Sequence, residues 1–392
     1  MDSALGETKP KAYPTRTLGR PLRIVMVAHK FPPFIGGIEM HVQQVGSRMA
    51  AMGHSVSVIT ADPEGTLPSE ETISGMSITR VRAYPRTSDI FFAPGVFNKI
   101  GPGSCDVIHV QGYHTLTPPV AILAAMRSRI PFVMTFHSGG HSSNSRQWLR
   151  APQHAAMRPL VRQAARLIGV SRFEADRFSE LVGVARNRFE VVPNGAQFET
   201  PKLTSSPDLN APLIISIGRL ERYKGHHLVI EAFADLVRRR PTARLKVLGE
   251  GPFKTDLIAQ VKHLGLTESV EVGGIPPERR QEMAKTMASA SLIVQMSEYE
   301  AHPIATLEAL SLGRPVLAAD TSGFTEMAED GLIRCIPLNS TASEIAAAME
   351  WEIDHPRLPT PFKLPTWEEC TNSLIRIYRD VIAEGSTGGN AR

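Results

Sequence analysis

The sequence has few of the features that mark membrane, secreted or metal-binding proteins. None of its apolar runs approaches the roughly 18 residues that a membrane helix needs, although the chain has 392 residues. The first twenty residues lack the apolar core of a signal peptide, and we expect them to form a flexible lead-in. Its three cysteines, Cys105, Cys335 and Cys370, have neither metal-binding nor redox spacing, which favours inert thiols in a reducing cytoplasm.

A complete dinucleotide-binding fingerprint is also missing. The loop after the first predicted strand contains Gly36 and Gly37 but not the full G-x-G-x-x-G pattern, which argues against a nicotinamide-dependent dehydrogenase. What the chain does have is an ordinary globular composition, with 42% hydrophobic and 21% charged residues. Its length exceeds what one hydrophobic core usually serves, so we expect two domains.

Charge is distributed unevenly along the chain. Residues 1–200 contain 22 Lys and Arg against 14 Asp and Glu, whereas residues 201–392 contain 21 against 25. The basic excess is concentrated in residues 146–188. Such a run is most often a solvated face, but it is also compatible with an anionic acceptor or with peripheral contact to an anionic membrane. We expect no nucleic-acid partner.

Short apolar strands alternate with helical segments in two series. A strand at 22–28, apolar residues at helical spacing from Ile38 to Met52 and a strand at 55–60 form a βαβ unit, which implies a parallel sheet. The polar, proline-bearing stretch 199–212 interrupts the alternation. The remaining predicted strands are 106–110, 131–136, 166–170 and 188–192 before this stretch, and 213–218, 244–249, 269–274, 291–295 and 315–320 after it.

The alternation predicts an α/β protein with two doubly wound, Rossmann-like domains, residues 21–198 and 213–365, joined by the linker 199–212. Ligands in such sheets bind beyond the carboxyl ends of the strands. The final segment, 366–392, contains a helix with one apolar stripe and ends in a frayed tail; no strand follows it, so the helix can pack on any remaining apolar groove, including one on the first domain. The least patterned parts, 62–103 and 139–160, are the expected acceptor loops.

The most informative stretch is SEYEAHPIATLEALSLGRPVLAAD, residues 297–320. It predicts a helix from about 303 to 312, directly after a strand. The free amides of Ile304, Ala305 and Thr306 would form an anion site at the edge of the sheet. Glu300 and Glu308 flank these amides, an arrangement that suits a ligand with hydroxyl groups on both sides of a diphosphate, such as a nucleotide sugar.

Two further stretches contain candidate site residues. In SIGRLERYKGHHL, Gly218 ends a strand, and Arg219 and Lys224 precede a helix, where cations are unfavourable unless an anion lies between them. In TFHSGGH, His137 follows a strand and could hydrogen-bond a sugar hydroxyl. His141 lies four residues further on, but the two glycines between them disfavour a helix, and we expect no metal site.

Taken together, these stretches resemble the retaining glycosyltransferases of family 4, which have the GT-B fold. The most specific element is the E-x7-E pair, Glu300 and Glu308. The supporting motifs are PPFIGGIEMHV, TFH, VSRFEADRF, VVPNGAQFE, SIGRLERYKG and VLGEGP. The resemblance covers residues 23 to about 383.

The resemblance implies a role for each matching residue. Glu308 would hold the ribose hydroxyls, and Glu300 hydroxyls of the transferred sugar. The implied catalytic residues are His137, Arg219, Lys224 and Glu300; the implied donor-binding residues are Gly36, Gly37, Gly218, Gly274, Ile304, Ala305, Thr306 and Glu308, with Val272 and Gly273 also near the base. The final helix would cross back to the first domain. The resemblance further implies retention of the anomeric configuration, no metal and no other cofactor.

This chain departs from the family pattern in two places. His302-Pro303 replaces the common Phe-Gly pair after the first glutamate, and Gln111 replaces the second histidine of His-x-His. The identities of the donor and the acceptor therefore stay open. We expect a UDP- or GDP-sugar as the donor, and a hydroxyl of a glycan, lipid-linked or small-molecule acceptor. We expect a cytoplasmic enzyme, with peripheral membrane contact left open. The alternatives are a sugar-nucleotide epimerase of the same architecture and a catalytically inert nucleotide-sugar-binding relative.

Overall fold

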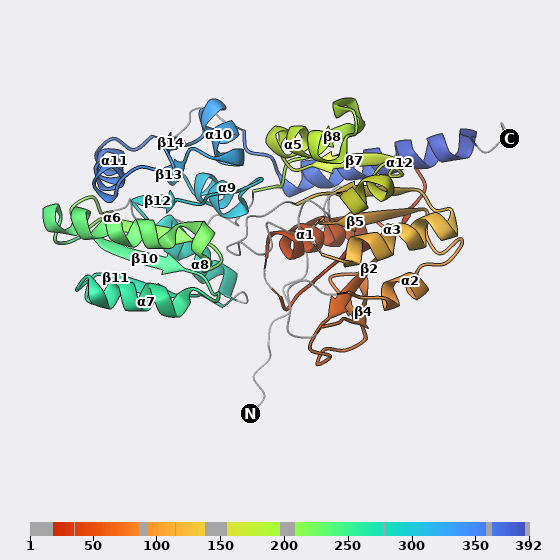
Figure 1. Ribbon diagram of the computed structural model, residues 1–392, viewed down its shortest axis with the longest axis horizontal. Coiled ribbons are helices and arrows are strands. Elements are labelled where there is room, and N and C mark those ends of the chain that lie inside the picture. Colours follow the sequence, from red (N-terminus) through yellow and green to blue (C-terminus); the bar gives the residue numbers. More distant parts are fainter. Residues whose placement is uncertain are drawn as a thin grey trace.

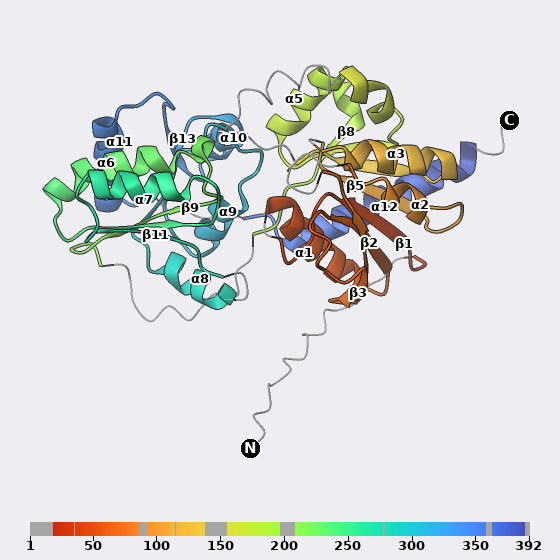
Figure 2. The same cartoon turned by 60° about the horizontal axis from the view of Figure 1, so that its bottom comes forward.

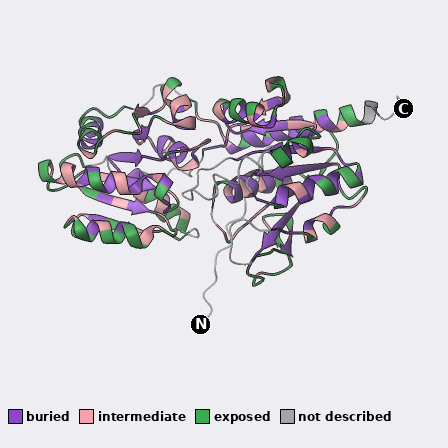
Figure 3. Cartoon of the chain, in the orientation of Figure 1, coloured by how far each residue is buried: buried purple, intermediate pink, exposed green. Residues whose placement is uncertain are grey.

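Two α/β domains lie side by side in the computed structural model (Figure 1). The structure describes residues 19–34, 36–85, 92–113, 115–137, 155–196, 208–276, 279–357 and 363–388. In each domain, helices cover both faces of a central sheet, and the strands are mostly buried (Figure 3). This burial on both faces explains why the strands read as continuous apolar runs in the sequence.

The sheet of the first domain has eight strands in the order β3-β4-β2-β1-β5-β6-β7-β8. Its strands are β1 Arg23–Ala28, β2 Ser55–Asp62, β3 Glu70–Ile73, β4 Met76–Arg82, β5 Val107–Gln111, β6 Phe132–Thr135, β7 Arg166–Gly169 and β8 Phe189–Val191. All neighbours pair in parallel except β3 and β4, which form an antiparallel hairpin at one edge. The chain order reverses between β1 and β5, and this makes the gap between them a topological switch point.

The sheet of the second domain has six parallel strands in the order β11-β10-β9-β12-β13-β14. Its strands are β9 Leu213–Ile217, β10 Arg244–Leu248, β11 Val270–Gly273, β12 Leu292–Gln295, β13 Val316–Ala319 and β14 Arg334–Ile336. Its switch point lies between β9 and β12. The loops that follow these two strands contain four of the predicted site residues, and the helix after β12 contains four more.

The helices follow the predicted alternation. They are α1 Gly37–Ala51, α2 Gly95–Lys99, α3 Thr117–Ser128, α5 Arg172–Val182, α6 His226–Arg239, α7 Lys254–His263, α8 Arg280–Ala288, α9 Ile304–Ser311, α10 Ser322–Glu329, α11 Ala342–Asp354 and α12 Trp367–Gly388, with 3-10 turns η1 Arg186–Arg188 and η2 Arg222–Lys224. Predicted helix 303–312 corresponds to α9, with Pro303 as its N-cap residue. The predicted strands all form. The sequence did not reveal β3, β4 and β14.

Helix α12 returns from the second domain and packs against α1 of the first domain. Its apolar stripe enters the same core cluster as β1, and Tyr378 hydrogen-bonds to the buried His109 of β5. The chain passes between the domains twice, and these two connecting segments are in contact. The amide of Ala196 in the first donates to the carbonyl of Pro365 in the second at 2.8 Å. The contact requires glycine at position 195, where a Cβ atom would lie 2.1 Å from the amide nitrogen of Trp367. The predicted linker 199–212 lies partly outside the described residues.

Candidate active site

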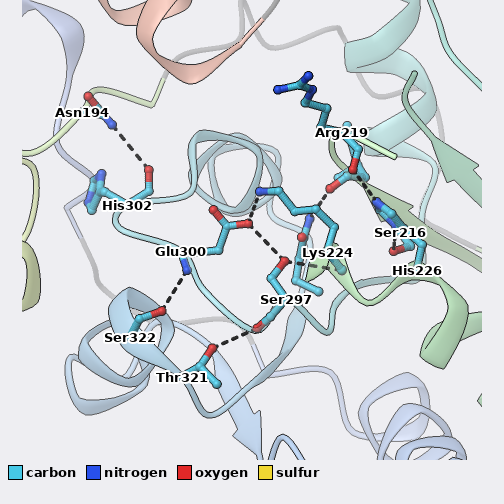
Figure 4. Close-up of polar contacts among 12 residues, drawn as sticks. Asn194, Ser216, Arg219, Lys224, His226, Ser297, Glu300, His302, Thr321 and Ser322 are labelled. Carbon is cyan, nitrogen blue, oxygen red and sulfur yellow. Dashed lines mark hydrogen bonds and ion pairs between the residues drawn. The ribbon is translucent and has the colours of Figure 1, made fainter. Parts of the chain in front are cut away.

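The centre of the candidate site is an ion pair between Lys224 and Glu300 at the second switch point (Figure 4). Lys224 ends η2 in the loop after β9, and Glu300 lies in the loop after β12, so adjacent parallel strands bring them together. Ser297 Oγ also donates to Glu300 Oε1 at 3.1 Å. Burial disfavours the Lys224 ammonium, but the charge and hydrogen bond of Glu300, together with the influence of Tyr223 and Glu221, outweigh it, and the pKa of Lys224 is raised.

A second ion pair lies on α9. Glu308 is 6% exposed and pairs with Arg280 of α8. Burial raises the pKa of Glu308, and the Arg280 charge and hydrogen bond partly counter that rise. The two glutamates of the E-x7-E pair therefore each have a cationic partner, which reduces the repulsion that they would exert on a bound diphosphate.

The start of α9 corrects one detail of the predicted anion site. The amide of Thr306 donates to the carbonyl of Pro303 at 3.1 Å, so it is not one of the free amides. Ile304 and Ala305 are the first residues of the helix, where an α-helix has no intrahelical acceptor for the backbone amide. Of the three predicted amides, only these two remain available for an anion.

The Arg219 guanidinium lies apart from the Lys224–Glu300 pair, although Arg219 and Lys224 belong to the same loop (Figure 4). Its guanidinium is half exposed and lies 3.3 Å from Glu221. The loop is held by His226, which hydrogen-bonds to Ser216 Oγ at 2.8 Å and to the carbonyl of Arg219 at 3.3 Å. Burial lowers the pKa of His226 to about 4, so it is neutral at pH 7 and serves as an uncharged brace.

The glycines predicted for the donor site lie at two strand ends and at the start of one helix. Gly218 directly follows β9, and Gly274 directly follows β11, where a Cβ atom would lie 2.9 Å from Glu250 Oε1. Gly36 and Gly37 start α1 in the first domain. Near them, burial raises the pKa of Glu39, while the charges of Lys30 and Arg219 counter the rise.

His137 lies beside α1 in the first domain. Its Nε2 donates to Gln111 Oε1 at 2.7 Å, and its ring centroid is 4.5 Å from that of His41. His41 in turn donates from Nδ1 to Asn194 at 2.9 Å, and burial lowers its pKa to about 4. The structure therefore joins three chain segments around His137. His141 and the glycines before it lie outside the described residues.

Several residues that shape this site escaped the sequence analysis. They are His41, Arg280, Ser216, His226, Ser297 and Ser322. A buried glutamate demands a cationic partner, so the assignment of Glu308 could have prompted a search for Arg280. His41 and Ser322 have partners 153 and 22 residues away, so no local spacing points to them. Ser216, His226 and Ser297 have partners three to ten residues away, within the two stretches that contain Lys224 and Glu300.

The described residues contain no group of three or more His, Cys, Asp or Glu side chains that could hold a metal ion. None of the helices in this part of the chain is both long and apolar enough to cross a bilayer.

Comparison with protein families agrees with this geometry. Residues 35–199 match the model described as Glycosyltransferase Family 4, and residues 201–363 match the model of Glycosyl transferases group 1. The chain belongs to glycosyltransferase family 4. This confirms the family predicted from the sequence motifs, the GT-B fold and the assignment of the chain as an enzyme.

This glycosyltransferase has similar relatives over nearly its whole length. It is 29% identical to a glycogen synthase of Mycobacterium tuberculosis over 91% of this chain and 94% of that protein. It is 26% identical to a D-inositol 3-phosphate glycosyltransferase of Nocardiopsis dassonvillei over 88% and 89%.

Solved structures show the same fold. A sucrose-phosphate synthase from Thermosynechococcus elongatus has a TM-score of 0.74 at 19% identity and covers 93% of this chain and 100% of its own. Anabaena HepE in complex with UDP-glucose has a TM-score of 0.65 at 18% identity, with 95% and 100% covered.

Proposed function

We propose that this glycosyltransferase transfers a sugar, with retention of anomeric configuration, from a nucleoside-diphosphate sugar to an acceptor hydroxyl. The observation that carries the proposal is the placement of the Lys224–Glu300 and Arg280–Glu308 pairs around the start of α9. Carboxylates beside the helix amides suit a ligand with a diphosphate between two hydroxyl-bearing sugars. The two cations keep both carboxylates compatible with that anion.

In the proposed complex, each residue acts on a different part of the donor. Glu308 accepts hydrogen bonds from the ribose, and Glu300 from the transferred sugar. The diphosphate displaces Glu300 as the partner of Lys224, aided by Arg219 and by the amides of Ile304 and Ala305. Displacement leaves the Glu300 carboxylate available to sugar hydroxyls, so donor binding converts an internal ion pair into two contacts with substrate.

The proposed reaction is a front-face displacement. The bond between the anomeric carbon and the diphosphate oxygen breaks, the acceptor oxygen bonds to the same face of that carbon, and the acceptor proton passes to the departing phosphate. Negative charge grows on the diphosphate as the bond breaks, and positioned cations and amides stabilise it. In this proposal Lys224 and Arg219 supply the positive charge, with no metal, and His137 contacts the transferred sugar from the first domain.

Two structurally similar proteins favour a UDP-sugar as the first donor to test. The HepE structure is a complex with UDP-glucose, and that of a pneumococcal O-GlcNAc transferase is a complex with UDP and GlcNAc. For the acceptor, the M. tuberculosis and N. dassonvillei relatives suggest a glucan or a phosphorylated cyclitol. We propose a hydroxylated carbohydrate or cyclitol acceptor, to be tested with each of these two classes.

We also propose that the basic stretch of the first domain contacts an anionic surface, and this is tested separately. Arg158, Arg162 and Arg188 donate to backbone carbonyl oxygens, which orders the guanidiniums but leaves their charge uncancelled. Flotation with neutral and with anionic vesicles distinguishes membrane contact from a merely solvated face.

The proposal is tested by thermal unfolding with UDP, GDP, ADP and dTDP, followed by assay of the matching sugar conjugates with and without EDTA. A ligand at 100 times its Kd should stabilise the fold by about 2.7 kcal/mol. Nucleoside diphosphate release that requires an acceptor supports transfer, and proton NMR of the new linkage reports retention. Conversion of the donor sugar without acceptor would favour the epimerase, and no binding of any diphosphate would favour the inert relative.

A further inference from the structure

Helix α10 of the second domain lies against the start of α5 in the first domain, as both views show (Figures 1 and 2). The carboxylate of Glu326 accepts hydrogen bonds from the backbone amides of Arg172 at 3.2 Å and of Phe173 at 2.9 Å. The Arg172 side chain adds two ion pairs, to Glu326 at 3.6 Å and to Asp330 at 3.0 Å. One carboxylate therefore joins the domains through both backbone and side chain.

The start of α5 suits this contact for a physical reason. The first amides of an α-helix lack intrahelical acceptors, and the helix dipole favours negative charge there. Ser171 caps the helix by accepting from the amide of Glu174 at 3.1 Å, which leaves the amides of Arg172 and Phe173 for Glu326. Because the Glu326 side chain is only 17% exposed, these charge-assisted bonds are poorly screened by solvent.

The other end of α10 holds the backbone of Glu300. Ser322 Oγ accepts from the amide of Glu300 at 2.8 Å, and the amide of Gly323 donates to the Glu300 carbonyl at 2.8 Å. The packing is so close that a Cβ atom at Gly323 would lie 2.2 Å from the carbonyl oxygen of Ala301. Both sides of the Glu300 residue are thus fixed to the first turn of the helix that contains Glu326.

The residue next to Glu300 contacts the first domain directly. The ring of Tyr299 lies 5.7 Å from the ring of Phe173, edge to face, and the guanidinium of Arg177 lies 5.5 Å from the Tyr299 centroid. Both partners belong to α5. Glu300 is therefore tied to α5 twice, through its neighbour in sequence and through α10.

We propose that Glu326 is a positioning residue for transfer, and that its contact with α5 fixes the Glu300 carboxylate relative to the first domain. This inference rests on the proposed role of Glu300 in holding the transferred sugar. Helix α10 is short, about 12 Å for eight residues, so a displacement at Glu326 moves the Glu300 backbone with it. A misplacement of about 1 Å at a reacting centre can cost about 100-fold in rate.

The test compares Glu326→Ala, Glu326→Gln and Arg172→Ala in the full-length protein. We expect kcat with a UDP-sugar to fall about tenfold in Glu326→Ala and less in the other two, since Gln retains one acceptor and Arg172→Ala retains both backbone amides. The Kd of UDP, measured by calorimetry, should stay within twofold, because the proposed nucleotide contacts lie in the second domain. Arg239→Ala, which removes the exposed Arg239–Glu350 pair inside the second domain, is the matched control.

A second readout does not depend on activity. Small-angle scattering should give a larger radius of gyration for Glu326→Ala than for the wild type and for Arg239→Ala, because a contact between the domains is lost. An unchanged kcat, an equal loss of UDP affinity, or an unchanged radius of gyration would each overturn the inference. Absence of transfer by the wild-type protein would instead reject the proposed function, and the scattering comparison would still decide whether Glu326 holds the domains together.

Discussion

The candidate site has two faces, one on each domain, and these differ in how their polar groups are balanced. On the second domain, Glu300 and Glu308 are each balanced by a cation from a neighbouring element. On the first domain, His137 hydrogen-bonds to the uncharged amide of Gln111, and His41 to that of Asn194, and burial lowers the pKa of His41 to about 4. Charge is concentrated on one face and uncharged hydrogen bonding on the other.

This difference suits different functions of the two domains in the proposed reaction. A diphosphate needs full positive charges, and these lie in the loop after β9 of the second domain. The first domain can contact a sugar or an acceptor without adding a charge that would compete for the diphosphate. The comparison can be broken or sharpened by substitutions on each face in turn.

The largest effect is expected from Glu300→Gln and Lys224→Met, which remove the central pair from the charged face. Each should lower kcat about 100-fold, the scale seen when one preorganised electrostatic group is lost. The measurement is the initial rate with a saturating donor, with circular dichroism to show that the fold persists. Full activity in both variants would mean that the charged face is not where transfer occurs.

A smaller effect is expected on the neutral face. His137→Ala removes the side chain that hydrogen-bonds to Gln111 and should lower kcat about tenfold, which corresponds to the loss of one hydrogen bond of about 1.4 kcal/mol. Because His137 lies in the first domain, the Kd of UDP should change less than twofold. A comparable loss of UDP affinity would show that the neutral face also binds the nucleotide.

The third substitution tests the pH dependence of the charged face. Burial raises the pKa of Glu308 and Arg280 limits that rise, so Arg280→Met should raise the pKa further. The ionised carboxylate is the form that accepts two ribose hydroxyls, and it is lost as pH falls. The donor KM of Arg280→Met should therefore increase as pH falls below the new pKa, by at most about tenfold per pH unit.

Arg280→Lys serves as its control, because it keeps a positive charge near Glu308. Its KM should follow the wild-type pH profile more closely than that of Arg280→Met. Identical profiles for all three proteins between pH 5.5 and 8.5 would argue against a binding role for ionised Glu308.

The smallest effect is expected from Glu39→Gln. Glu39 lies at the start of α1 and is 6% exposed, and burial raises its pKa. The glutamine amide has nearly the same shape as the carboxylate that it replaces. We expect donor KM to change less than threefold. A larger change would show that the charge of Glu39 takes part in positioning Arg219, and the first face would no longer count as neutral.

The sequence was informative about elements whose signal is local. Apolar runs located the strands other than β3, β4 and β14, and Pro303 with Gly313 located α9. The hairpin of β3 and β4 was missed because only one of its faces is buried, and the alternation is short. β14 has three residues, none of them buried, which is too little for a pattern.

In the candidate site, too, the residues that the sequence revealed are those with a local signal. E-x7-E and the loop from Gly218 to Lys224 were recognisable because each lies within one short stretch. The roles given to these residues stay predictions until the substitutions above are measured.

The sequence by itself determined the two doubly wound sheets and the family, since burial patterns and contiguous motifs are properties of neighbouring residues. Only the tertiary structure decided that Lys224 pairs with Glu300, that Arg280 reaches Glu308, and that Glu326 caps a helix of the other domain. These partners are separated by 76, 28 and 153 residues, measured for Glu326 to Phe173. Such pairings depend on strand order and domain docking, which no local pattern encodes.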